Sequence, residues 1–516
     1  MKQNIYKCLA CLFVLSLALP AGAPAQEREN TPATLERMKA ENPWSRSGNA
    51  GGILLDDLVR YSVFDLSYRS LGGNFHRPQQ GAKVHHLDFS AEGGVFLDKL
   101  YAWGNFAYRR ENTRDANFNS SIIDPYRGMP YYTADLNPSD WENQFYDIRF
   151  KAALPLGGRL LAGIDGTYRV AQAAKQRDPR TLNQFYALDL RPGLVFLLAP
   201  AHRVGLNVEY GNLKENSAPA LVNTGDYQTY YELYGLGTAI ENIGTGRTVN
   251  YVGNRLGGEV QYNFRRAAVN LLLAGGYAYK VEEAEFSFTT PEKFGTTREK
   301  EWRLSLSLDL PGERFSHHLG ALYLRDGIDG IQHVKRNTTD QGWQILHSNV
   351  RSSYRAGVAS LDYALTANSG AGYKWKAGAL VRYRDKEDLY LLPRSSKSAA
   401  NLLFAVNGKA VVYRSARYAR ALLLGAAAGT SRNLSGAYSY AGANAAYKVV
   451  TDLEQVDLNY LVSSYYFAGG DVTYSRKARE TGRATLYLKG AVNYRESGSS
   501  AFDHRALVQL SIGCTY

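Results

Sequence analysis

Cysteine and long apolar runs are scarce in this sequence, and each absence excludes a class of protein. Only 3 of the 516 residues are cysteine, which excludes a disulfide-stapled scaffold. Beyond the N-terminus, no apolar run approaches the roughly 20 residues that a membrane-spanning helix requires. A disordered chain is excluded because 45% of the residues are hydrophobic and 12% are aromatic. No linker-like segment divides the chain, so we expect one large closed structure.

The N-terminus has the pattern of a secretory signal peptide. Lys2 and Lys7 precede an apolar run, and the small residues Ala23 and Ala25 then stand before Gln26. We therefore predict a cleaved signal peptide over residues 1–25. The mature chain would keep Cys514 as its only thiol, so it could form no disulfide within itself.

From about residue 59 to the end, apolar side chains alternate with polar or small ones, which is the period of β-strands. Segment 372–386 is the clearest case. One face carries Tyr373 and Tyr383 near its ends and small aliphatic residues between them, while Lys and Arg occupy the other face. Aromatic rings at both ends of an apolar face are typical of strands that cross a bilayer, because the rings settle at the two interfaces.

Short and long connections alternate along the chain. Segments 97–99, 155–158, 199–202 and 311–314 are short, whereas 111–142, 213–246, 326–352 and 431–457 are long. This alternation predicts an all-β fold: a transmembrane, antiparallel, up-and-down β-barrel with short periplasmic turns and long extracellular loops. We count 18 strands over residues 59–516 and accept 14 to 18.

The last strand carries a separate signal. Its apolar face runs from Ala506 to Tyr516, and the chain stops on that aromatic residue. This strand resembles the C-terminal insertion signal of outer-membrane barrels. The resemblance implies that the barrel-assembly machinery recognises this strand and that the barrel lies in outer-membrane lipid of a Gram-negative bacterium.

Residues 26–58 precede the first predicted strand and form a separate unit. The stretch Asn42-Pro43-Trp44 followed by Asn49-Ala50-Gly51-Gly52 resembles the segment with which fatty-acid-transporter-type barrels fill their lumen. We keep two alternatives for these residues, a lumen plug and a periplasmic tail. As a whole, the Tyr-rich chain resembles the uncharacterised outer-membrane β-barrel proteins of Bacteroidota, a family that implies a fold and a location but no catalytic residues.

Basic residues outnumber acids on the strand faces opposite the apolar ones. A basic lumen would attract anions; alternatively, the charges pair across the barrel as a polar core. The predicted lumen-lining residues are Lys374, Lys376, Arg382, Arg384, Arg159, Arg169, Arg303 and Lys489.

Two long loops are rich in aromatic residues with polar tips. Such rings suit the capture of a solute or a partner's surface, or they hold the loops together above the barrel. The candidates are Tyr227, Tyr230, Tyr231 and Tyr234 in one loop, and Tyr126, Tyr131, Tyr132 and Trp141 in the other.

The sequence contains no hydrolase motif such as Gly-x-Ser-x-Gly or His-Glu-x-x-His, so we predict no catalytic residue, metal or cofactor. His85-His86 and His317-His318 are adjacent on strands and therefore point to opposite faces. Nucleic acid is excluded as a partner because the basic residues are spread singly and the signal peptide directs export.

These patterns predict an outer-membrane channel or transporter for small or amphipathic solutes. Two alternatives stay open. One is an accessory or surface-binding barrel in an uptake or secretion assembly, and the other is an outer-membrane hydrolase. The solute and any partner protein are unknown at this stage.

Overall fold

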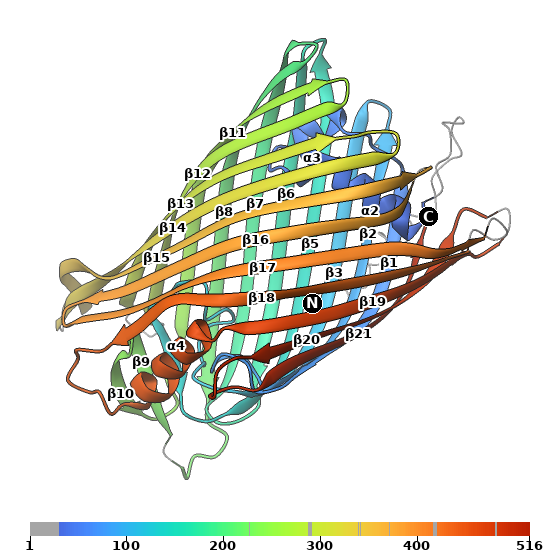
Figure 1. Ribbon diagram of the computed structural model, residues 1–516. Helices are drawn as coiled ribbons and strands as arrows, with labels where there is room; N and C mark the ends of the chain where they lie inside the picture. Colours follow the sequence, from blue (N-terminus) through green and yellow to red (C-terminus); the bar gives the residue numbers. More distant parts are fainter. Residues whose placement is uncertain are drawn as a thin grey trace.

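The computed structural model describes residues 30–226, 228–286, 291–338, 340, 342–370, 372–415, 420–479 and 482–516. The predicted signal peptide lies outside these residues. Long antiparallel strands form one closed barrel (Figure 1). Its strands are β1 (Tyr61–Gly72), β2 (Lys83–Leu97), β3 (Leu100–Ala116), β5 (Ser139–Gly157), β6 (Leu160–Lys175), β7 (Arg180–Ala199), β8 (His202–Ala220), β11 (Val249–Arg266), β12 (Val269–Phe286), β13 (Glu292–Leu310), β14 (Phe315–Thr338), β15 (Gly342–Ser369), β16 (Gly372–Leu391), β17 (Arg394–Ser415), β18 (Arg420–Ser439), β19 (Tyr465–Lys477), β20 (Thr485–Ser497) and β21 (His504–Thr515).

The barrel closes where its first strand meets its last. β1 pairs on one side with β2 and on the other with β21, with Leu66 opposite Ile512 in the second pairing. The sheet has 18 strands, so the predicted strand number and the antiparallel barrel fold are confirmed. An interior of this width is too large to be filled by the side chains of the wall alone.

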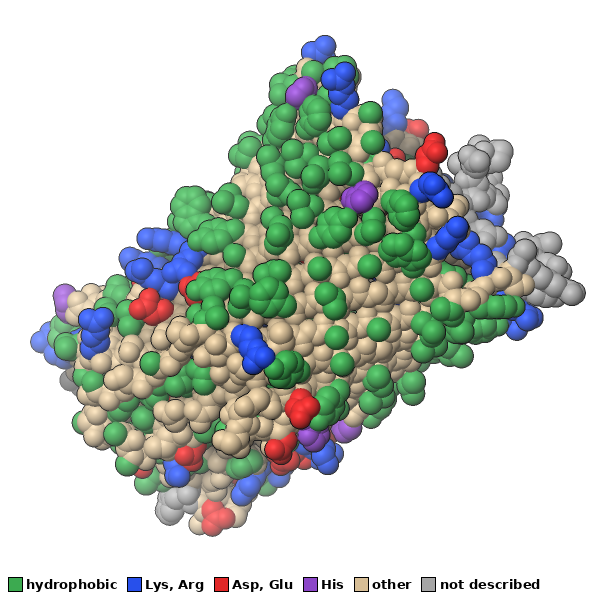
Figure 2. All heavy atoms as spheres, viewed as in Figure 1, with side chains coloured by type: hydrophobic (Ala, Val, Ile, Leu, Met, Phe, Trp, Pro, Cys, Tyr) green, Lys and Arg blue, Asp and Glu red, His purple; other side chains and the backbone are tan. Residues whose placement is uncertain are grey.

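The alternation of side chains sends apolar residues outward. Leu66, Val492 and Leu510 are 45%, 57% and 63% exposed, which is unfavourable in water and expected against lipid. Figure 2 shows hydrophobic side chains spread over the outer wall, with most charged side chains toward the two ends. Among the described residues, no helix is long and apolar enough to cross a bilayer.

Three residues depart from the predicted faces. A β-bulge in the pairing of β15 with β16 places Tyr373 opposite Asn368 and Trp375 opposite Ala367. Lys374 is the extra residue, and Tyr373 consequently turns inward, where it is 1% exposed, instead of facing lipid. Arg159 belongs to the turn between β5 and β6, so it does not line the lumen along a strand as predicted.

The predicted long connection 326–352 is mostly a strand extension. β14 and β15 continue through it as a hairpin, and β16 and β17 are likewise joined at residues 392–393. The prediction of long loops was wrong there, because these strands keep their pairing beyond the length that crosses a bilayer. Three connections, between β3 and β5, between β8 and β11, and between β18 and β19, contain structure of their own.

These three connections form a cap at one end of the barrel. Its parts are a small sheet of β4 (Tyr132–Asp135), β9 (Thr229–Gly235) and β10 (Thr238–Ile243), a π-helix η3 (Val449–Glu454) and the helix α4 (Gln455–Val462). At the opposite end lie the N-terminal helices α2 (Pro32–Glu41), α3 (Pro43–Arg46) and the 3-10 helix η1 (Ala50–Leu55) (Figure 1).

Candidate functional site: the lumen and its two ends

The N-terminal segment 30–58 lies inside the wall and contacts strands on several sides of the lumen. Helix α2 begins with a capping box between Thr31 and Thr34. Its Glu36 accepts hydrogen bonds from Lys376 Nζ at 2.5 Å and Tyr373 OH at 2.6 Å. Predicted lumen residue Lys376 therefore faces inward, but its charge is neutralised by the segment.

Apolar contacts continue the attachment beyond α2. Trp44 is 1% exposed and packs with Leu161, Val195 and Leu272 on three different strands. Ile53 packs with Tyr101 and Ala153 on two more. The segment thus contacts inward-facing residues from β3 to β12.

Asn49 fixes the segment to the wall through its side-chain amide. Nδ2 donates to Leu194 O at 3.0 Å, to Leu206 O at 3.2 Å and to Gln261 Oε1 at 2.9 Å. The Oδ1 atom accepts from the Gly51 backbone N–H at 3.0 Å and so caps η1. One side chain therefore joins the segment to β7, β8 and β11.

Inward-facing glycines make room for this contact. A Cβ on Gly163 would lie 2.3 Å from Gly51 N, and one on Gly193 would lie 2.3 Å from Asn49 Oδ1. A Cβ on Gly205 would come within 2.9 Å of Asn49 Nδ2. These three glycines, on β6, β7 and β8, let the segment approach the backbone of the wall, and we call them the glycine seat.

Charges in the middle of the lumen are largely paired. Arg169 lies 3.1 Å from Asp189, and Arg303 lies 2.7 Å from Glu301. Arg255 bridges Glu209 and Glu301 at 2.8 and 3.1 Å. These groups line a cavity of about 230 Å³. For Arg169 and Arg303 the structure therefore shows the paired, polar-core alternative.

The other predicted basic residues differ from this pattern. In the described part of the chain Lys374, Arg382 and Arg384 form no ion pair, and the side chain of Lys374 is exposed. Lys489 lies on the inward face of β20 near Asp65. A positive region therefore remains along β16, smaller than the sequence predicted.

A connecting loop enters the barrel from the opposite end. Residues 117–131 fold inward, and Arg127 forms ion pairs with Glu215 and Glu282 on β8 and β12. Those two carboxylates are 0% and 1% exposed, so the pairing is buried. Sequence reasoning missed Arg127, because no local pattern distinguishes one loop arginine that enters the lumen.

The cap is also tied to the wall through α4. Asp457 accepts hydrogen bonds from Arg77 Nε at 2.5 Å and Lys397 Nζ at 2.9 Å. Burial opposes the charged form, but Lys397 and Arg77 together hold the pKa of Asp457 well below its usual range.

Most of the predicted binding aromatics are buried in the cap and hold it together. Tyr131 and Tyr234 belong to one apolar cluster, Tyr231 to a second, and Tyr132 packs against both. Tyr230 is 7% exposed, and Tyr227 lies outside the described residues. Burial of Tyr131, Tyr231 and Tyr234 in these clusters fits the alternative in which the rings hold the loops together, and the binding role of these residues stays a prediction.

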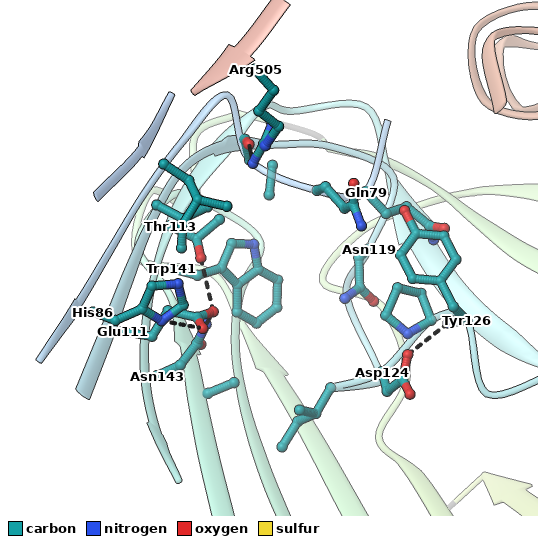
Figure 3. A pocket seen from close by; sticks show the side chains of 18 of the residues that line it. Gln79, His86, Glu111, Thr113, Asn119, Asp124, Tyr126, Trp141, Asn143 and Arg505 are labelled. Atoms are coloured by element: carbon teal, nitrogen blue, oxygen red, sulfur yellow. Dashed lines mark hydrogen bonds and ion pairs between the residues drawn. The ribbon is translucent and has the colours of Figure 1, made fainter. Parts of the chain in front are cut away.

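Trp141 and Tyr126 differ, since both line a cavity of about 620 Å³. Trp141 lies on β5 rather than in a loop, and Tyr126 lies in the inward-folded loop. Figure 3 shows the indole standing between a group of His86, Glu111 and Asn143 and a facing pair of Asn119 and Tyr126. The described residues contain no cluster of three His, Cys, Asp or Glu suited to a metal.

A family model described as "Family of unknown function (DUF6850)" matches residues 50–516. The chain belongs to this family. No curated protein matches the sequence significantly.

Solved structures with a related fold are distant. BauA, the ferric preacinetobactin receptor from Acinetobacter baumannii, is 9% identical with a TM-score of 0.41, covering 89% of this DUF6850 chain and 80% of its own. The FrpB iron transporter from Neisseria meningitidis is 10% identical with a TM-score of 0.38, covering 91% of this chain and 83% of its own. At this level of similarity neither match bears on function.

Proposed function

We propose that the protein is an outer-membrane transporter for small solutes whose lumen is obstructed at rest by its own N-terminal segment. The observation that carries this proposal is the way segment 30–58 is held. Its attachments to the wall include hydrogen bonds of Asn49, an ion pair of Glu36 and packing contacts of Trp44. Such contacts are reversible, so the segment can serve as a gate.

The lumen itself supports a transport path. Eighteen strands leave a wide interior, and its inward faces are polar and charged around cavities of about 620 and 230 Å³. Arg384, and Arg382 beside Asp362, form no ion pair among the described residues and would favour anions or electronegative groups along β16.

The first experiment is single-channel conductance of the mature chain in a planar bilayer, compared with a variant lacking residues 26–58. We expect little current from the full chain and a steady current from the truncated one. A heat-modifiable band on a denaturing gel confirms that each barrel has folded. If neither folded protein conducted a current, the transport proposal would be refuted.

The ordered cap favours one alternative function, an accessory or surface-binding barrel. Its sheet β4–β9–β10 and helix α4 form a structured outer surface around the buried clusters. An absence of current from both folded proteins would favour this function over transport.

An outer-membrane hydrolase is the third alternative. Ester hydrolysis by the refolded protein would establish it. Cleavage of the signal peptide, recognition of β21 and Tyr516 by the barrel-assembly machinery, and an origin in Bacteroidota stay predictions. Tyr516 is 55% exposed, and its backbone pairs with Ser62 of β1.

A further inference from the structure

The larger cavity lies between the wall and the inward-folded loop 117–131. Its volume of about 620 Å³ falls in the range of small-molecule sites. β2, β3, β5, β20 and β21 contribute wall residues, and the loop contributes Asn119 and Tyr126. What the cavity could bind depends on which of its polar groups are already engaged by the protein.

The charged groups of the cavity have partners. Asp124 accepts a hydrogen bond from the Tyr126 backbone N–H at 2.9 Å. Glu111 lies 3.1 Å from His86 and accepts from Asn143 and Thr113 at 3.1 Å each. Arg505 donates to the backbone carbonyls of Gly73 and Gly81. Arg495 lies over the Tyr465 ring at 4.9 Å. Because both signs occur and these groups are engaged, the cavity is poorly suited to a strongly charged ligand.

The unengaged polar atoms are neutral. Among the described residues, Asn119 Oδ1, Asn143 Oδ1 and Tyr126 OH are buried and lack a well-formed hydrogen bond. The Gln79 backbone N–H acts on the Tyr126 oxygen as a donor, so the phenol proton stays free to donate. Each such atom costs about 1 to 3 kcal/mol when it stays unsatisfied. Two amide oxygens accept hydrogen bonds, and a phenol donates or accepts, so a ligand with several hydroxyl groups would satisfy all three.

The Tyr126 phenol is a dependable donor. Burial raises the pKa of Tyr126 far above its ordinary value, so its proton is retained at neutral pH. The guanidinium of Arg77 lies over the ring at 3.6 Å and fixes its position. A ligand hydroxyl would therefore meet a preformed partner.

The cavity also contains a flat apolar surface, the indole of Trp141. The Trp141 side chain is 5% exposed, and its indole stands across the cavity from Asn119 and Tyr126 (Figure 3). An indole face packs against the C–H face of a sugar ring, while amide and phenol groups bind the equatorial hydroxyls. We propose that this cavity binds a neutral carbohydrate of one or two rings. The inference rests on the proposed transport function, because it names the class of solute.

The test measures binding of glucose, maltose and N-acetylglucosamine by isothermal titration. The mature protein is held in a detergent without sugar groups. Tyr126→Phe removes only the unengaged hydroxyl, so the fold should keep its stability while affinity falls about 3- to 10-fold, as expected for one neutral hydrogen bond. Asn119→Leu removes the facing acceptor and should weaken binding similarly.

Tyr131→Phe is the matched control. Its hydroxyl is also buried without a partner and comes from the same loop, but it lies in the cap cluster and does not line the cavity. We expect this variant to bind like the wild type. Equal effects of Tyr126→Phe and Tyr131→Phe, or no binding of any of the three sugars by the folded protein, would overturn the proposal.

The outcome separates this inference from the transport proposal. Current through the truncated barrel without sugar binding would refute the carbohydrate site alone. Sugar binding by a barrel that never conducts would support the site and refute transport.

Discussion

Adding a single methyl group to the glycine seat should release the N-terminal segment without changing any of its residues. In Gly163→Ala the new Cβ would lie 2.3 Å from Gly51 N and 2.5 Å from the carbonyl carbon of Ala50, where ordinary contacts begin at 3.4 Å. Backbone atoms on both sides leave no flexible side chain to yield. The segment must therefore move by about 1 Å, the difference between 3.4 and 2.3 Å.

Such a shift carries the Asn49 amide away from its acceptors on β7, β8 and β11. The bonds measure 2.9 to 3.2 Å and would exceed hydrogen-bonding length after that movement. Its two hydrogens contribute about 0.5 to 1.5 kcal/mol each, so the docked state loses about 1 to 3 kcal/mol. This corresponds to an increase of about 5- to 150-fold in the undocked fraction.

Hydrogen exchange of residues 44–55 measures the docking directly, and planar-bilayer conductance measures its effect on the lumen. We expect faster exchange and more frequent opening in Gly163→Ala. Gly408→Ala is the control, since its Cβ would face the outside of β17 with its nearest contact at 3.7 Å. Wild-type exchange in Gly163→Ala would refute the seat, and faster exchange without added current would refute the segment as a gate.

Three further predictions follow from the wall and the cap. Ala379→Arg on the lipid face should lower the free energy of unfolding by about 2 to 4 kcal/mol. Leu380→Arg points inward, opposite Asp362, and should lower it less. Urea titration of both variants decides whether the two faces are assigned correctly. Replacing Lys374, Lys376, Arg382 and Arg384 by Glu should shift the selectivity of the truncated, conducting barrel toward cations, and an unchanged reversal potential would refute a basic lumen. Because the pKa of Asp457 is lowered in the folded cap, its stabilising effect is present above the ordinary value of 3.8 and is lost as the pH falls below it. Hydrogen exchange of residues 449–462 should therefore become faster in that acidic range. Asp457→Asn breaks a buried ion pair, so it should show the faster exchange already at neutral pH.

The barrel could be predicted because one physical rule, alternation against lipid, acts on every strand. The rule places Val381 and Tyr383 outside and Arg382 and Lys376 inside, as the register of β16 shows. It failed at Lys374, where a bulge inserts one residue, because a bulge leaves no trace in hydropathy.

The ends of the lumen were less predictable, because they depend on contacts between distant parts of the chain. Asn49 and the glycines of the seat are separated by more than a hundred residues, and Gly163 in the sequence is indistinguishable from any strand glycine. Burial of Tyr131 and Tyr234 depends on how two loops pack together, which alternation does not determine. The polar atoms that face Trp141 in the cavity, such as Asn119 Oδ1 and Tyr126 OH, are brought there by the packing of loop 117–131, which the sequence pattern does not determine.

The contact between Asn30 and the last strand sets an order of events during assembly. Asn30 donates to Tyr516 O and Arg60 O at 3.0 Å, and Thr515 donates to Asn30 O. These acceptors come together only when β1 has paired with β21. The N-terminal segment is synthesised before the barrel, but this contact can form only after β1 and β21 have paired. Docking at Asn30 therefore follows closure of the barrel. An incompletely zipped barrel would leave this segment loose at the end opposite the cap, where proteases can distinguish it from the completed protein.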